Sequence, residues 1–239
     1  MLEAFSGGQI IYGYMLSTDG RHIPFFDDRG VRMRYLVISD LHGDAAAITK
    51  ALSYFDKYNC DQLVTLGDIL NHGPRNPIPD QYSPPKAIEL LNAYKDRVIA
   101  VRGNCDAEVE SMQLSYPCNA PYAFILVPDP NAKAGEKVKH QRIMLTHGHL
   151  YKIDHEDMEK AVSMRDKLGL QEGDIVFSGH THVAGFFEKK NGLINANPGS
   201  TTLPKGGTQA GFGLILEDRI ELRALHTDEL VATHMLRFI

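Results

Sequence analysis

The chain has 239 residues, of which 43% are hydrophobic and 23% are charged. This length allows one large domain or two small ones with a buried core, and the composition excludes disordered, collagenous and disulfide-scaffold proteins. The 30 acidic residues outnumber the 25 lysines and arginines, for a net charge of −5, which argues against a surface built for long nucleic acid, because such a surface must neutralise phosphates.

Cysteine content and hydropathy indicate the compartment. The three cysteines, Cys60, Cys105 and Cys118, are an odd number in a chain of this length, which favours a reducing environment over a secreted disulfide framework. No apolar run approaches the roughly 18 residues that span a bilayer, and the N-terminus lacks the basic-then-apolar order of a signal peptide. We therefore expect a cytoplasmic protein with no membrane partner.

Residues 1–32 stand apart from the rest, because they are rich in glycine and weakly patterned. Segments 10–16 and 22–26 flank Ser17-Thr18-Asp19-Gly20, a sequence that can form a hairpin. An upstream start codon or added residues would explain the segment equally well. We expect an N-terminal extension of unknown role over residues 1–32, followed by one domain over residues 33–239.

From Met33 onward, strands and helices alternate. A buried strand is predicted at 33–39, and Asp44 then caps a helix that ends near Asn59. The next expected elements are a strand at 62–66, a helix at 86–94 entered through Pro84-Pro85, a strand at 98–101 and a short helix at 107–114.

The same alternation continues before the chain becomes mostly β. A strand is predicted at 142–145, a helix at 156–168 closed by Gly169, and a strand at 175–177. Short strands then follow at 185–188, 193–195, 213–216 and 220–224. The overall pattern predicts an α/β fold.

Polar side chains of the metal-binding type recur directly after the predicted strands. They are Asp40, His42, Asp68, Asn104, His147, His180 and His182. Because the carboxyl ends of strands in an open α/β sheet gather ligands, we expect these residues to surround one crevice. The set suffices for two divalent ions only if one group bridges them, and Asp68 is the natural bridge. Oxygen and imidazole ligands without a thiolate cluster favour Mn²⁺, with Zn²⁺ or Fe as alternatives, and two such ions predict a phosphate-containing substrate.

These residues lie in motifs that resemble the calcineurin-like metallophosphoesterases in order and spacing. The motifs are Asp40-x-His42, Gly67-Asp68, Gly103-Asn104-Cys105-Asp106, Thr146-His147-Gly148-His149, Gly179-His180-Thr181-His182 and Asn197-Pro198-Gly199-Ser200. Within that superfamily, segments 67–76 (GDILNHGPRN) and 101–106 (VRGNCD) are similar to those of the YfcE-type bacterial phosphodiesterases. The resemblance covers residue 33 to about the C-terminus and leaves residues 1–32 unexplained.

The resemblance implies a four-layer αββα sandwich with a metal site at the carboxyl ends of its strands. It implies two metal positions, one among Asp40, His42, Asp68 and His182, and one among Asp68, Asn104, His147 and His180. In that family, a hydroxide bound to the two-metal centre attacks phosphorus in line, as expected for a pair of metal ions that clamp the attacking and leaving oxygens. The implied activity is hydrolysis of a small phosphodiester.

Alternative functions stay open at this level. A phosphomonoesterase or a nuclease would use the same site, and a retromer subunit of the same fold serves as a protein-binding scaffold with an incomplete metal set. All seven positions hold competent ligands here, which favours catalysis. The sequence leaves open whether the chain forms a homo-oligomer.

Several residues near the motifs are candidates for supporting roles. Arg75 and His72, in the proline-rich loop 71–85, are candidate phosphate contacts. His149 is a candidate phosphate contact or a structural histidine. Cys105 stands where many superfamily members carry a histidine beside the leaving oxygen, and it either assists that oxygen weakly or fills a small apolar gap.

Two further motif segments are predicted to be structural. Asp106 precedes the helix predicted at 107–114, which favours an N-cap for this residue. Segment 197–200 (NPGS) has the composition of a turn, which predicts a structural corner that braces the site.

Overall fold

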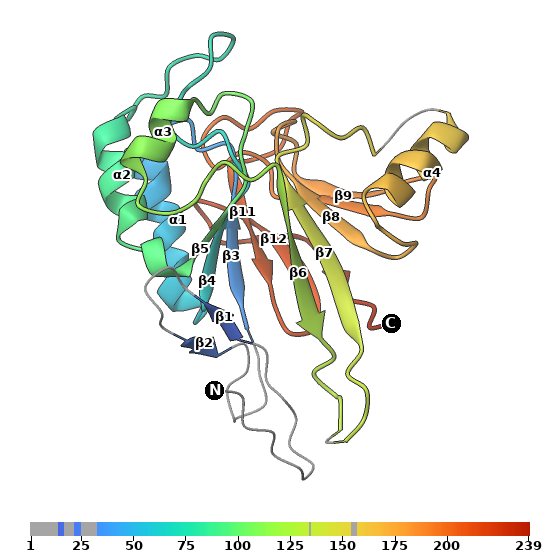
Figure 1. The fold of residues 1–239 in the computed structure, drawn as a ribbon. Coiled ribbons are helices and arrows are strands. Elements are labelled where there is room, and N and C mark those ends of the chain that lie inside the picture. Colours follow the sequence, from blue (N-terminus) through green and yellow to red (C-terminus); the bar gives the residue numbers. More distant parts are fainter. Residues whose placement is uncertain (1–13, 17–21, 25–32, 134, 154–156) are drawn as a thin grey trace. The chain divides into compact units, whose positions relative to one another are not determined.

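The computed structural model describes residues 14–16, 22–24, 33–133, 135–153 and 157–239, and the chain divides into two compact units, Met1–Arg32 and Met33–Ile239. In the first unit, β1 (Tyr14–Leu16) pairs antiparallel with β2 (His22–Pro24), as a hairpin would (Figure 1). The connecting turn and half of the residues in the two segments expected to form that hairpin lie outside the described residues.

The second unit contains two mixed sheets. The six-stranded sheet has the order β13-β12-β11-β3-β4-β5, and the five-stranded sheet has the order β6-β7-β8-β10-β9. The strands of the first are β3 (Tyr35–Ile38), β4 (Gln62–Thr65), β5 (Val98–Ala100), β11 (Gly211–Ile215), β12 (Arg219–Ala224) and β13 (Leu230–Met235). Those of the second are β6 (Tyr122–Pro128), β7 (His140–Thr146), β8 (Ile175–Ser178), β9 (Gly185–Glu188) and β10 (Ile194–Asn197). Strands β3, β4 and β5 are parallel, as are β7, β8 and β10.

Helices lie on the outer side of each sheet (Figure 1). On the side of the six-stranded sheet these are α1 (Ala45–Lys57), α2 (Pro84–Asn92) and α3 (Glu108–Gln113), with a 3₁₀ turn at Lys95–Arg97, whereas α4 (Met158–Lys167) lies on the side of the five-stranded sheet. Alternating residues of β3 show how these layers are held together. Leu36 packs with Phe55 of α1, while Val37 packs with Phe177 of the other sheet. A third apolar cluster, including Met144, covers the far face of the five-stranded sheet. The architecture is therefore the expected four-layer αββα sandwich.

Local sequence accounts for the main helices. The Asp44 carboxylate accepts a hydrogen bond from the Ala47 amide at 2.9 Å, so α1 begins where the sequence predicts. In α4 the cap is Asp157, and the helix begins at Met158, not at the predicted residue 156, which lies outside the described residues. Gly169 follows this helix at φ +66°, the left-handed conformation that ends helices.

Two strands were not predicted from the sequence. Strand β6 is apolar on both faces and lies at a sheet edge, so it lacks the alternation that marks a half-buried strand. Strand β13 is an edge strand with exposed Leu230 and Val231, and its pairing with β12 is interrupted by a register shift. Within the described part of the chain, no helix is both long enough and apolar enough to cross a membrane.

Deleting residues 1–32 is expected to leave the second unit folded, because that unit holds its own layered core. The truncated chain should unfold cooperatively within a few degrees of the full chain in a thermal scan and should keep its metal content. A truncated chain that folds but binds no metal would show that the extension helps to build the site.

Candidate metal site

The polar residues predicted from the sequence lie where the parallel strands end. Asp40 and His42 follow β3, Asp68 follows β4, and Asn104 follows β5. The other three follow the five-stranded sheet: His147 directly after β7, and His180 and His182 after β8. The candidate ligands therefore come from both sheets, each at the end of a strand.

Five of these seven residues have left-handed backbone conformations. The φ angles are +53° for Asp40, +45° for His42, +53° for Asp68, +68° for His180 and +60° for His182. Each such residue costs about 1 kcal/mol relative to an ordinary conformation, so the surrounding structure must enforce it. Strain of this kind concentrates at functional sites, and here it accompanies the abrupt turns that follow the strands.

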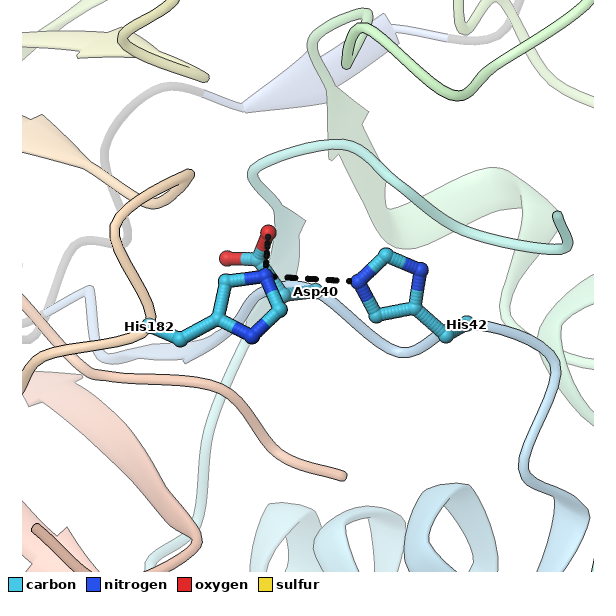
Figure 2. A group of neighbouring side chains, drawn as sticks. All are labelled: Asp40, His42 and His182. Carbon is cyan, nitrogen blue, oxygen red and sulfur yellow. Dashed lines mark hydrogen bonds and ion pairs between the residues drawn. The ribbon is translucent and has the colours of Figure 1, made fainter. Parts of the chain in front are cut away.

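The ligand atoms form three overlapping groups, in each of which they lie within 4.8 Å of one another. Two groups contain only carboxylates and imidazoles: Asp40, His42 and His182 in the first, and Asp40, Asp68 and His147 in the second. The third joins the Cys105 thiol to His42 and Asp68. Figure 2 shows the first group, with the two imidazoles and the carboxylate facing one another. The Nε2 atoms of His42 and His182 are 3.4 Å apart, and Asp40 Oδ1 lies 3.2 Å from His182 Nε2.

Backbone carbonyls determine which nitrogen of each imidazole carries a proton. In three rings Nδ1 lies beside a carbonyl oxygen, which can only accept a hydrogen bond, so Nδ1 carries a proton and each ring in its neutral form presents a lone pair at Nε2. The pairs are His42 with Asn71 at 2.9 Å, His147 with Leu66 at 2.8 Å and His182 with Leu203 at 2.6 Å. This is the arrangement by which proteins orient metal-binding histidines.

The donor set therefore fits a cation. The Nε2 atoms of His42 and His182 face each other across 3.4 Å, and the buried Asp40 Oδ1 accepts no hydrogen bond from the described residues. Imidazole lone pairs and a buried carboxylate oxygen without a hydrogen bond repel one another. Their proximity is therefore unfavourable unless a positive ion lies among them. Asp40, His42 and His182 thus have the chemistry of a divalent metal site.

Asp68 lies between the first group and the second. Its Oδ2 is 3.9 Å from His42 Nε2, whereas its Oδ1 is 3.5 Å from His147 Nε2. The Asn104 Oδ1 atom approaches the same His147 Nε2 at 3.0 Å, so a second set of acceptor atoms converges there. The Cys105 amide donates to Asp68 Oδ1 at 2.8 Å and holds that carboxylate in place.

His180 and His149 lie beside this second set. The His180 ring centroid is 5.1 Å from that of His147, but the ring nitrogens of His180 belong to none of the three groups of converging ligand atoms. The His180 amide donates to Asp40 Oδ2 at 3.0 Å. The His149 ring is 5.3 Å from that of His147, and its Nδ1 is buried with no hydrogen-bond partner among the described residues.

Burial favours the neutral form of two of these imidazoles. It lowers the pKa of His42 and of His180, so each ring is available as a metal ligand at neutral pH. Burial also opposes the charge on His182, but the Asp40 carboxylate outweighs it and raises the pKa of that ring. For Asp40, burial opposes ionisation, yet His182, His147 and the Ser39 hydroxyl together lower its pKa, so the carboxylate is charged.

Asp106 does not cap the helix as predicted. Helix α3 begins after Ala107 with no side-chain cap, and the Asp106 carboxylate instead accepts hydrogen bonds from the amides of Asp68 (2.9 Å), Ile69 (2.7 Å) and Gly103 (2.6 Å). These three bonds outweigh a helix cap, because a carboxylate that accepts several buried amides is strongly stabilised. Asp106 therefore fixes the backbone that carries Asp68.

The two loops that Asp106 joins pack closely. A Cβ atom on Gly103 would lie 2.2 Å from the Asp68 amide nitrogen, and one on Gly67 would lie 2.4 Å from the Gly103 nitrogen. Gly67 also has φ +94°. Only glycine allows the backbones after β4 and β5 to approach this closely.

Glu110 of α3 lies behind Asp106 and was not anticipated from the sequence. Its side chain is buried, and its Oε2 has no hydrogen-bond partner among the described residues. Burial first, and the Asp106 carboxylate second, raise the pKa of Glu110 to about 9. At neutral pH this carboxyl is therefore protonated.

The segment 197–200 forms the structural corner that its composition predicts. The Asn197 side-chain amide donates to the Gly179 carbonyl at 2.8 Å, which supports the turn before His180. The Ser200 hydroxyl donates to the Asp40 carbonyl at 2.7 Å. The corner thus braces the loops that carry ligands from both sheets.

A cleft of about 730 Å³ opens onto the metal-ligand groups, a volume suited to a small molecule. Candidate ligands that follow each of the two sheets line this cleft, together with Arg75, Cys105 and Lys205. His72 is not among the lining residues, and its ring packs edge-on against Tyr82 with centroids 5.4 Å apart. Lys205 was not predicted, because no strand or motif precedes it.

Comparison with known proteins connects this geometry to a family. The profile of the calcineurin-like phosphoesterase superfamily domain matches residues 33–218. The chain is 38% identical over 200 residues to Phosphodiesterase YfcE of Escherichia coli strain K12, an alignment that covers 84% of this chain and 96% of that protein. It is 26% identical over 220 residues to Probable metallophosphoesterase MJ0623 of Methanocaldococcus jannaschii, covering 91% and 93% of the two chains.

Solved structures also align with this chain. The YfcE phosphoesterase of E. coli aligns with a TM-score of 0.71 and 36% identity, over 86% of this chain and all of the other. Vps29 of Chaetomium thermophilum aligns with a TM-score of 0.51 and 16% identity, over 86% of this chain and 100% of that one. At that identity the second likeness concerns the fold alone.

Replacing Glu110 by glutamine is expected to change how stability depends on pH. The folded-state pKa is about 9 and the ordinary value is 4.5, so between these values the folded state holds a proton that the unfolded state has released. The free energy of unfolding of the wild-type protein therefore falls as pH rises through this window. Glutamine carries no such proton, so the Glu110→Gln variant should gain stability relative to wild type as pH rises from about 5 to 9.

Urea unfolding at several pH values measures this difference. Glu108→Gln is the matched control, because Glu108 is an exposed carboxylate of the same helix, and it should track wild type. Parallel stability curves for wild type and Glu110→Gln would show that Glu110 is ionised in the folded protein.

Proposed function

The chain belongs to the calcineurin-like phosphoesterase superfamily and is a phosphoric ester hydrolase; from this premise we propose that it hydrolyses a small phosphodiester at a centre of two divalent cations, by in-line attack of water on phosphorus. The observation that carries the proposal is the convergence of Nε2 lone pairs on the buried carboxylates of Asp40 and Asp68. Mn²⁺ is the favoured ion, because oxygen ligands are mixed with imidazoles, and Zn²⁺ or Fe are alternatives.

Two sets of residues would hold the ions. One comprises Asp40, His42, Asp68 and His182, and the other comprises Asp68, Asn104, His147 and His180. The two Asp68 oxygens lie toward different imidazoles, Oδ2 toward His42 and Oδ1 toward His147, which supports a bridging role. The contact between the His180 and His147 rings supports placing His180 in the second set.

When bound, two divalent ions lower the pKa of water and neutralise charge on the phosphoryl oxygens. The chain's own residues provide the orientation. Backbone carbonyls hold three imidazoles with Nε2 toward the centre, and Asp106 holds the loop of Asp68. Arg75 lines the cleft, which supports its candidacy as a contact for an anionic group of the substrate. His72 stays a candidate contact only if its ring leaves Tyr82.

The leaving oxygen needs a proton, and the nearby residues are weak donors at neutral pH. Burial and the adjoining Asp68 raise the pKa of Cys105 to about 12. Burial, followed by His147 and His180, lowers the pKa of His149, which is therefore neutral at pH 7. This site favours esters whose leaving groups depart without protonation.

The remaining features are consistent with a small substrate in a reducing compartment. The net charge of −5 disfavours long nucleic acid as the substrate, and Cys60, Cys105 and Cys118 are free thiols, as expected in a cytoplasm. A protein-binding scaffold could lose a metal ligand without harm, whereas this chain has residues competent to bind metal at all seven positions.

The proposed function is tested with bis(p-nitrophenyl) phosphate. Turnover should stop in the presence of a chelator and return best with Mn²⁺, because the proposed attack needs a water of lowered pKa. Turnover that persists after complete removal of metal, verified by elemental analysis, would contradict the proposal.

The bridging role of Asp68 predicts a specific pattern of metal loss. Asp68→Asn should reduce both bound ions, because both would share this carboxylate, while His182→Ala should mainly reduce one. Metal content after dialysis measures the difference, with His226→Ala as the control because His226 is exposed and outside the motifs. Loss of the same single ion from both site variants would contradict the bridge.

The Cys105→His variant is expected to extend hydrolysis to poorer leaving groups. An imidazole with an ordinary pKa near 6.5 donates a proton far more readily than a thiol whose pKa is about 12. Rates for a series of diesters should therefore depend less steeply on leaving-group pKa than in wild type. Cys105→Ser controls for packing, and an unchanged slope in the histidine variant would show that this position takes no part in leaving-group departure.

A further inference from the structure

The cleft carries two cationic side chains that have no anionic partner within the described part of the chain. Arg75 and Lys205 both line it and are exposed. Among the described residues, neither makes an ion pair, and the only side-chain contact of Lys205 Nζ is with Asn76 Oδ1 at 3.4 Å. The single carboxylate in the cleft lining is Asp68, which belongs to the candidate metal site.

Arg75 is positioned by a loop that is tied to the metal site. The Asn76 amide donates to the Gly73 carbonyl at 3.3 Å, closing a turn over Pro74 and Arg75. The Gly73 amide donates to the side chain of Asn71 at 2.8 Å, and the Asn71 carbonyl accepts the proton of His42 Nδ1. The loop and the imidazole therefore hold each other in place.

Lys205 is positioned in the same way from the other side. Its amide donates to the His182 carbonyl at 3.0 Å, and its carbonyl accepts the Thr208 hydroxyl at 2.8 Å. The Leu203 carbonyl accepts the proton of His182 Nδ1. The Lys205–Asn76 contact then joins this loop to the loop of Arg75, so the backbone of both residues is held beside the metal ligands.

We propose that Arg75 and Lys205 form an anion subsite that recognises a second oxyanion, a phosphate or a carboxylate, on the substrate. This inference rests on the proposed phosphodiesterase function and specifies the class of diester. A guanidinium can bind two oxygens of such a group, and an ammonium adds a mobile positive charge. In a chain with a net charge of −5, two unpaired cations from separate loops at one cleft select for an anionic substrate.

Three esters that share one leaving group test the proposal. They are 4-nitrophenyl phosphodiesters whose second arm is ethyl, 2-phosphonooxyethyl or 2-carboxyethyl. The wild-type protein with Mn²⁺ should show kcat/KM at least about tenfold higher for one or both anionic arms than for the ethyl arm, as expected for a partly exposed charge-assisted contact. The anionic arm that gains more identifies the oxyanion, and the preference should weaken as salt concentration rises.

Variants assign the preference to the two cations. The ratio of kcat/KM between the anionic and ethyl esters should fall in Arg75→Gln and in Lys205→Gln, and should approach one in the double variant. Lys95→Gln is the matched control, since Lys95 is an exposed lysine on the turn Lys95–Arg97, and it should keep the wild-type ratio. Equal kcat/KM values in wild type, or a preference that survives in the double variant, would overturn the proposal.

Equilibrium binding separates this inference from the proposed function. Phosphonate analogues, in which a methylene replaces the ester oxygen of the nitrophenyl group, cannot be hydrolysed at that bond, and calorimetry gives their Kd values. Tighter binding of the anionic analogues that is lost in the double variant supports the subsite even if no ester is turned over, a result that would contradict only the proposed hydrolysis. Equal Kd values for the ethyl and anionic analogues would overturn the subsite.

Discussion

The burial of Asp40 and Asp68 where the two sheets meet is the constraint on which the rest of the site depends. Both carboxylates are almost completely buried, and an isolated buried charge costs several kcal/mol or more. Their neighbours are imidazoles whose protons are directed away, toward backbone carbonyls. These rings contribute lone pairs where the carboxylates need positive charge. Divalent cations are the partners that would satisfy both kinds of group at once.

The scaffold holds this unfavourable arrangement in place through its backbone. Asp106 binds three amides of the loops after β4 and β5, and Ser200 and Asn197 support the turns that carry Asp40 and His180. Such contacts enforce the left-handed conformations that turn the ligands inward. A set of ligands fixed before a metal arrives needs little reorganisation to bind it. The proposed metal centre and the proposed anion subsite therefore share one supporting framework, because the loops of Arg75 and Lys205 are tied to His42 and His182.

Local pattern was sufficient to predict the central strands and the capped helix α1, because buried runs and helical periodicity are properties of neighbouring residues. It also identified the polar residues after those strands. It did not reveal the edge strands β6 and β13, whose alternation is weak. It also misplaced Asp106, because an aspartate before a helix is typical of an N-cap, whereas its actual partner, the Asp68 amide, lies 38 residues away in sequence. Glu110 and Lys205 gain their properties from burial and from neighbours distant in sequence, which local pattern does not encode.

Calorimetric titration of chelator-treated protein with Mn²⁺ tests most directly whether the buried carboxylates require cations. The account predicts about two ions bound per chain, and a thermal unfolding midpoint that rises with Mn²⁺ concentration, because a ligand that binds only the folded state stabilises it. Absence of saturable binding, with an unfolding midpoint that does not respond to Mn²⁺, Zn²⁺ or Fe²⁺, would contradict it.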